Sequence, residues 1–125
     1  MGYFELNYIF RMNKAVEMLR IPTRPLNCQL CDRPEQLTKH HLIPRTYHSR
    51  RQFRKLFTKE DMITRILWIC TPCHKNLHAT FSEKMLGLEY NSQEKLLSST
   101  EIARFVAWLK DKPVGFKLKV NWKAK

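Results

Sequence analysis

The sequence predicts a small α+β domain held together by a metal ion, and three observations support this. Two C-x-x-C pairs, a β-branched and aromatic segment at 63–70 and several helical segments share 125 residues. A chain of this length suits one domain, and a domain this small is helped by a structural metal. We therefore expect one domain over 1–125, with an N-terminal extension (1–27), a core (28–86), and C-terminal helices with a basic strand (92–125).

Two strands are expected in the core. The segment "LTKHHLIPR" (37–45) predicts a short strand that runs into a loop at Pro44, since proline cannot donate to a strand ladder. The segment "ITRILWIC" (63–70) predicts the second strand because it is rich in β-branched and aromatic residues. Residues 45–59 are expected to form a basic loop between them.

Local signals also place helices and a last strand. Gly87 suits the stop of the central helix, and Ser98 with Glu101 has capping-box spacing. Apolar residues alternate with lysines and an asparagine over 116–122, which predicts a half-buried strand with a basic outer face. Helices are predicted over 13–20, from the second cysteine pair to about Leu86, and over 98–110.

The charge balance favours a polyanionic partner. Lysine and arginine number 23 against 11 acids, which gives a net charge of +12. Nucleic acid is the first candidate, and an anionic membrane surface is the second. No apolar run is long enough to span a membrane, and the first residues lack the features of a secretion signal. We expect a cytoplasmic, nucleoid-associated protein with reduced thiols and no membrane partner. The sequence does not specify an oligomeric state.

The four cysteines predict a structural zinc site. Cys28 and Cys31 form one C-x-x-C pair, and Cys70 and Cys73 form another, with 38 residues between the pairs. Two such knuckles complete a tetrahedron of thiolates around Zn²⁺, and this site is closed to substrate. Two disulfides or buried free thiols are the alternatives, which the lack of a secretion signal and the doubled spacing weaken.

Four histidines suggest a second, different metal site. His74 and His78 are four residues apart and share one face of a helix, whereas His40 and His41 are neighbours on a strand and point to opposite faces. A metal held by His40, His74 and His78 would keep positions open for water and phosphate, while His41 would accept a proton. A mixed Cys/His zinc site or surface histidines are the alternatives. Lys75 argues against the H-E-x-x-H motif of zinc proteases.

The combined motif "CQLC…LTKHHLIPR…WICTPCHKNLHATF" resembles the HNH endonuclease family, of the ββα-metal or His-Me finger class. The likeness is to the zinc-knuckled form found in small bacterial proteins. It is strong over 28–81 and looser to about residue 113. The resemblance implies two strands and a helix around the metal, and makes 28–86 a nuclease core.

The resemblance also implies roles for the histidines. His41 aligns with the general base that activates water, and His40, His74 and His78 align with the ligands of a catalytic divalent metal. In this family the metal stabilises the phosphate and the leaving 3′ oxygen, so that a 5′-phosphate end results. The metal could be Mg²⁺, Mn²⁺, Ni²⁺ or Zn²⁺, and three imidazoles suit the last three better than Mg²⁺.

One position departs from the family pattern. Many members carry an asparagine at the start of the second strand, where this sequence has Arg65. That asparagine holds the loop that orients the base, so a backbone carbonyl or the Thr64 hydroxyl must orient His41 instead. Arg65 could clamp a phosphate.

The basic loop is expected to contact DNA. Tyr47 and Phe53 could stack on bases if a strand is opened, although a solvated loop with buried aromatics is the alternative. Phosphate contacts would give weak sequence specificity and a steep salt dependence. The cations expected to bind nucleic acid are Arg45, Arg50, Arg51, Arg54, Lys55, Lys59 and Arg65.

The sequence thus predicts a metal-dependent endonuclease that hydrolyses double-stranded DNA, with RNA or branched DNA left open as substrates. The alternative is a non-catalytic zinc-knuckle protein that binds or shapes DNA. Such a protein would need the cysteines and the charge but not the histidine pairs.

Overall fold

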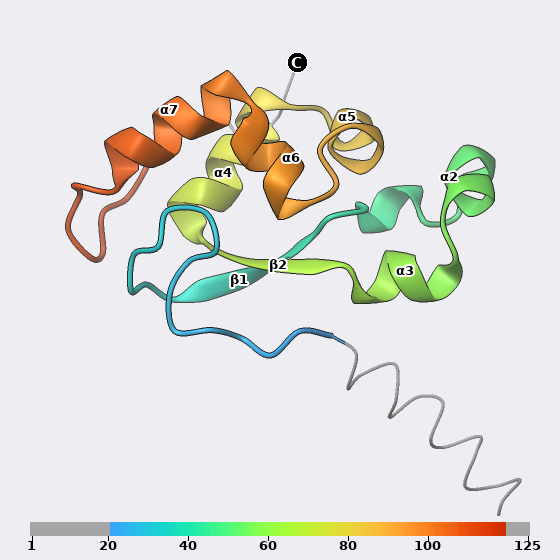
Figure 1. Ribbon diagram of the computed structural model, residues 1–125, viewed down its shortest axis with the longest axis horizontal. Coiled ribbons are helices and arrows are strands. Elements are labelled where there is room, and N and C mark those ends of the chain that lie inside the picture. The colour runs from blue at the N-terminus through green and yellow to red at the C-terminus, as the bar shows by residue number, and fades with distance from the viewer. Residues whose placement is uncertain (1–20, 120–125) are drawn as a thin grey trace, which may run out of the picture.

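The computed structural model describes residues 21–119 and places a two-stranded antiparallel sheet against several short helices (Figure 1). The predicted α+β class is confirmed. The predicted helix over 13–20 and the rest of the N-terminal extension before residue 21 lie outside the described residues. The elements in chain order are β1 (Leu37–His41), the 3-10 helix η1 (Arg45–Tyr47), α2 (Arg51–Leu56), α3 (Lys59–Thr64), β2 (Ile66–Cys70), α4 (Thr71–Thr80), α5 (Glu83–Leu88), α6 (Gln93–Ser98) and α7 (Thr100–Leu109).

The two predicted strands pair with each other. β1 runs antiparallel to β2, and the register extends from Leu37 opposite Cys70 to His41 opposite Ile66. Most side chains of β2 are buried, which suits its β-branched and aromatic residues. Figure 1 shows α4 to α7 on one side of the strands, while α2 and α3 lie beyond the end where β1 leaves and β2 enters. The main core lies between β2, α4, α6 and α7.

Helix α4 begins directly after β2 but is shorter than predicted. Pro72 lies in its first turn, where a missing N–H costs nothing. The helix ends at Thr80 because Phe81 has an extended backbone and Ser82 starts a new helix, accepting a hydrogen bond from the backbone N–H of Met85. The single helix predicted to run to about Leu86 is therefore two helices.

Gly87 is not the helix stop that its position suggested. It is buried within α5, and a Cβ built on it would lie 2.6 Å from Cε2 of Phe53. A glycine is needed here because the backbone of α5 packs directly against the ring of Phe53 in α2.

The basic segment 45–59 is not a loop, which corrects a second expectation. It contains η1, α2 and the start of α3, and Thr58 caps α3 by accepting from the Asp61 N–H. Phe53 is 0% exposed and packs in a small second core with Ile43 and Met62. It therefore cannot stack on a nucleobase, contrary to the prediction.

Two details of the C-terminal part also differ from the prediction. Ser99, not Ser98, caps α7 by accepting from the Ile102 N–H, so the capping box with Glu101 does not form. Residues 116–119 are not in a strand, and the remainder of the predicted basic strand lies outside the described residues.

Candidate metal centres

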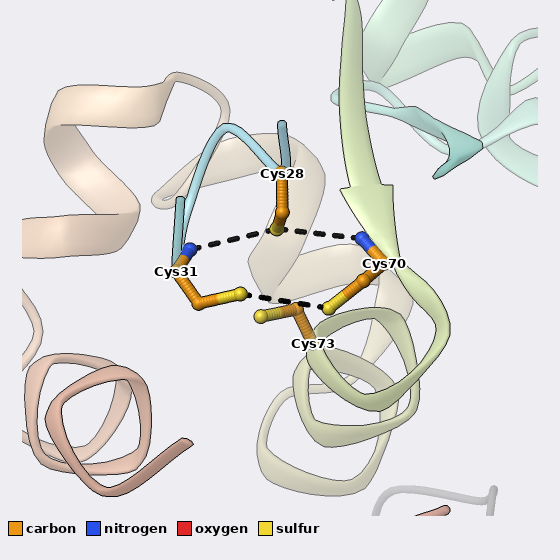
Figure 2. A group of neighbouring side chains, drawn as sticks. All are labelled: Cys28, Cys31, Cys70 and Cys73. Atoms are coloured by element: carbon orange, nitrogen blue, oxygen red, sulfur yellow. Dashed lines mark hydrogen bonds between the residues drawn. The ribbon is translucent and has the colours of Figure 1, made fainter. Parts of the chain in front are cut away.

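Four cysteines meet where the first knuckle touches the end of β2 and the start of α4 (Figure 2). Each is at most 2% exposed, and all four are free thiols, so the disulfide alternative is wrong. The sulfurs of Cys31 and Cys70 lie 3.7 Å apart. A tetrahedral zinc with bonds of about 2.3 Å requires about 3.8 Å between sulfurs, so the four residues fit a structural metal such as zinc.

Cys28 is the hydrogen-bonding centre of this cluster. Its sulfur accepts backbone N–H groups of Leu30, Cys31 and Cys70 at 3.3–3.5 Å. The pKa of Cys28 lies well below the usual thiol value, chiefly because of the hydrogen bond with the Cys31 side chain. The hydrogen bond with the Cys28 sulfur, followed by those with the other two cysteines and by burial, raises the pKa of Cys73. A bound metal would let all four sulfurs be thiolates, which is how Cys₄ sites bind zinc.

Three histidines form a separate cluster that joins β1 to α4. His40 comes from β1, and His74 and His78 come from successive turns of α4. The ring centroids are 5.2 Å apart for His40 and His74, 5.7 Å for His40 and His78, and 5.0 Å for His74 and His78. One ligand atom from each lies within 4.8 Å of the others, an arrangement that could hold a metal ion. The cysteines and the histidines form two separate groups, so they do not make a mixed Cys/His site. The three histidines also lie together, so they are not scattered over the surface.

His40 is the least satisfied member of the cluster. Its side chain is 1% exposed, and within residues 21–119 its Nε2 has no hydrogen-bond partner. A buried polar atom without a partner is costly and calls for an explanation such as an ion. Burial first, and then the neighbouring His74 and His78, hold the pKa of His40 well below its usual value. Its ring is therefore neutral and carries the lone pair that a metal ligand needs.

The other two rings are also kept neutral. Burial lowers the pKa of His74 to about 4, with the charge of His78 as a further cause. Burial also lowers the pKa of His78, although Glu83 opposes the shift. Neutral imidazoles are the ligand form, so the three rings could serve as metal ligands.

Thr38 fixes the tautomer of His74. Its hydroxyl donates to the Ile69 carbonyl at 3.0 Å and lies 2.9 Å from Nδ1 of His74. Because the hydroxyl proton is engaged with the carbonyl, the Thr38 oxygen accepts from His74, which places the ring proton on Nδ1 and the lone pair on Nε2. No sequence motif indicates Thr38, although period two on β1 puts it on the same face as His40.

The histidine cluster opens into a small pocket. The cavity has a volume of about 200 Å³ and contains His41 as well as the three clustered rings. His41 is half-buried, and burial followed by the charges of Arg45, His48 and Lys39 lowers its pKa. The pocket is lined by His40, His41, Pro44, Arg45, Thr46, His74, His78 and Glu83.

Glu83 is a second residue that the sequence did not indicate. The break after α4 turns the chain back so that the first residue of α5 faces the histidines. Its carboxylate accepts a hydrogen bond from the Thr46 hydroxyl at 2.5 Å. The pocket therefore contains one carboxylate beside the cation Arg45.

The expected support of His41 by Thr64 is not seen. The Thr64 hydroxyl donates to the Glu60 carbonyl at 2.8 Å, and within residues 21–119 no hydrogen bond holds the His41 ring. The His41 ring instead meets His48 edge-on, with centroids 6.3 Å apart. His48 is itself fixed by a bond of 2.7 Å from Nε2 to the Ile43 carbonyl.

A search of curated proteins gives a relative of this chain. An uncharacterized protein, YisB of Bacillus subtilis (strain 168), is 36% identical over 89 residues, which span 69% of this chain and 75% of YisB. The chain belongs to the YisB family. No protein-family model and no solved structure matches it.

The predicted DNA-binding cations of this YisB relative are spread over neighbouring elements. Arg45 lines the histidine pocket, while the guanidinium of Arg65 lies 5.8 Å from the centroid of the Phe57 ring. The Arg50 guanidinium lies 5.3 Å from the Tyr47 ring centroid. The exposed members of the predicted DNA-binding cations are Arg45, Arg50, Arg51, Arg54, Lys55 and Lys59.

Among the helices within residues 21–119, none has the length and apolar character of a membrane span.

Proposed function

We propose that the protein is a metal-dependent DNA endonuclease of the HNH, or His-Me finger, type. One observation supports this most strongly: three imidazoles gather around one point, and a fourth, His41, lines the same open pocket. The resemblance of the two-strand and helix motif to the HNH family adds to this support. A closed cysteine cluster nearby accounts for the fold, so the histidines are available for chemistry.

In the proposed reaction His41 acts as the general base. Burial and nearby cations keep its pKa low, so the ring is neutral at physiological pH and can accept a proton. The proton comes from a water molecule, whose oxygen forms a new bond to phosphorus. The bond from phosphorus to the 3′ oxygen breaks, and this oxygen leaves with the electron pair and takes a proton from solvent. The products are a 3′-hydroxyl and a 5′-phosphate.

His40, His74 and His78 would hold a divalent metal in this site. When bound, such an ion supplies positive charge to the phosphate and to the leaving oxygen. The orphaned Nε2 of His40 and the Thr38-fixed tautomer of His74 both favour the role of ligand. Imidazole ligands favour Mn²⁺, Ni²⁺ or Zn²⁺ over Mg²⁺.

The cations suggest how DNA is held. Arg45 lies in the pocket, where it can pair with the scissile phosphate, and the exposed cations of α2 and α3 can contact phosphates further along. Contacts of this kind fix position without reading bases, which predicts weak sequence specificity and a steep salt dependence.

A non-catalytic zinc-knuckle protein that binds DNA is the second candidate, favoured by the same cations and cysteines. It gives no reason for an unpartnered buried nitrogen on His40 or for His41 beside it.

Plasmid cleavage distinguishes the two candidates. Zinc-loaded protein with Mg²⁺, Mn²⁺ or Ni²⁺ should nick or linearise plasmid and leave 5′-phosphate ends. His41→Ala should cut about 10²- to 10⁴-fold more slowly, because the general base is lost. Its DNA affinity and zinc content should be unchanged, and Lys110→Ala, a truncation of an exposed cation after α7, should cut normally. Wild-type protein that binds DNA but cuts with none of these metals would establish the binding protein instead.

A further inference from the structure

A second cavity lies beside the histidine pocket, on the side of α2 and α3. We propose that this cavity receives one unpaired nucleobase of the strand that is cut. The inference rests on the proposed function and deepens it, because it specifies the form of nucleic acid that the site accepts.

The cavity has the size and walls of a ligand site. Its volume is about 550 Å³, within the range of roughly 300–1,000 Å³ typical of small-molecule pockets. Phe57, Met62 and Ile63 provide an apolar surface, and Ser49 and Thr58 add hydroxyl groups. An apolar, partly aromatic wall with a few polar atoms suits the face and edges of a heterocyclic base.

The position of the cavity relates it to the proposed reaction. His48 lines the cavity, and its ring centroid lies 6.3 Å from that of His41 in the neighbouring pocket. The bond from His48 Nε2 to the Ile43 carbonyl fixes this ring between the two spaces. A strand whose phosphate faces His41 would therefore carry a neighbouring base past the mouth of the cavity.

The charge around the cavity favours a nucleotide over an apolar ligand or an acyl chain. Arg54 and Lys59 both line it and are exposed, while none of its lining residues is acidic. Cations beside an aromatic surface are the combination that holds single strands, since phosphates meet the cations while bases meet the ring.

Phe57, and not Phe53 as predicted from the sequence, is the phenylalanine ring that lines this cavity. Phe53 is fully buried, whereas Phe57 is partly exposed and forms a wall of this cavity. A base in a duplex is stacked and cannot enter, so it must first be unpaired. Single strands, flaps and mismatched duplexes should therefore bind better than a fully paired duplex.

The test compares strands with and without bases. Full-length, zinc-loaded His41→Ala protein keeps the DNA intact while fluorescence anisotropy measures its affinity for a fluorescein-labelled single strand. An abasic strand of the same length retains the phosphates but has no bases to insert. We expect the base-bearing strand to bind roughly 5- to 150-fold more tightly, the range for stacking one base.

A cavity-filling variant then locates the effect. Ser49→Trp enters from an exposed wall position and should remove the preference for bases, while Ser98→Trp, at the exposed end of α6, should keep it. If Ser49→Trp retains the full preference, or if the two strands bind equally to the parent protein, the cavity does not take a base and the endonuclease proposal still stands. If no strand or duplex binds at all, the proposed function fails as well.

Discussion

The cysteine cluster and the histidine cluster both take residues from α4, yet they meet solvent in different ways. The thiols are 0–2% exposed, and the Cys28 sulfur accepts three backbone N–H groups, so the cluster has no open side for a substrate. His74 and His78 are partly exposed and border a cavity of about 200 Å³. Closed sites of four protein ligands build folds, whereas sites with open positions do chemistry. In the proposed function, this contrast is a division of labour between a closed structural site and an open metal site, both of which take residues from α4.

The largest expected effects separate the two clusters by mutation. Cys28→Ser should lose zinc and lower the melting temperature by more than about 15 °C, because structural zinc supplies on the order of 10 kcal/mol in small metallo-domains. His78→Ala should retain about one zinc per chain and melt within about 3 °C of wild type. It should lose the second ion, measured as Mn²⁺ binding by calorimetry.

This comparison has a clear failure. If His78→Ala were to lose zinc and unfold like Cys28→Ser, the histidines would be part of the staple, and the division between the clusters would be wrong.

A smaller effect should come from Thr38, which touches only one of the clusters. Thr38→Val removes the hydroxyl that holds Nδ1 of His74 while keeping the strand-favouring shape. Loss of such outer partners typically reduces metal affinity 10- to 100-fold. We expect this loss for Mn²⁺, an unchanged zinc content, and near-normal binding by Thr38→Ser. If Thr38→Val bound Mn²⁺ as tightly as the wild type, the Thr38 hydroxyl would not be what positions His74 as a ligand.

The smallest expected effect concerns pH. The pKa values of all three clustered histidines are lowered, that of His74 to about 4, so the rings stay neutral as the pH falls from 7.5 to 6. Mn²⁺ affinity of the zinc-loaded protein should therefore fall less than about fivefold over this interval, and steeply only near pH 4. Three imidazoles with ordinary pKa values would lose roughly 50-fold, and a loss of that size in calorimetric titrations would contradict the burial argument.

The sequence predicted the parts of the site that follow from local periodicity. The spacing of four correctly put His74 and His78 on one helical face. Alternation along β1 predicts opposite faces for His40 and His41, yet both line the same pocket. The C-x-x-C pairs likewise predicted the closeness of the four thiols.

What the sequence missed depends on where the chain turns and on long-range packing. The helix ends at Thr80, and this break brings Glu83 into the pocket. Ser82 is an ordinary N-cap residue, but the apolar pattern continues past it and obscured the boundary. Gly87 looked like a helix stop because its contact with Phe53 is made by a residue 34 positions earlier, which no local pattern reveals.

Cys73 and His74 are consecutive residues in the first turn of α4, so one peptide unit joins the two clusters. Oxidants or chelators that remove a metal ion from the sulfurs would destabilise that turn and displace an imidazole of the histidine cluster. In the proposed endonuclease, loss of the sulfur-bound ion would therefore stop cleavage without any molecule entering the histidine pocket.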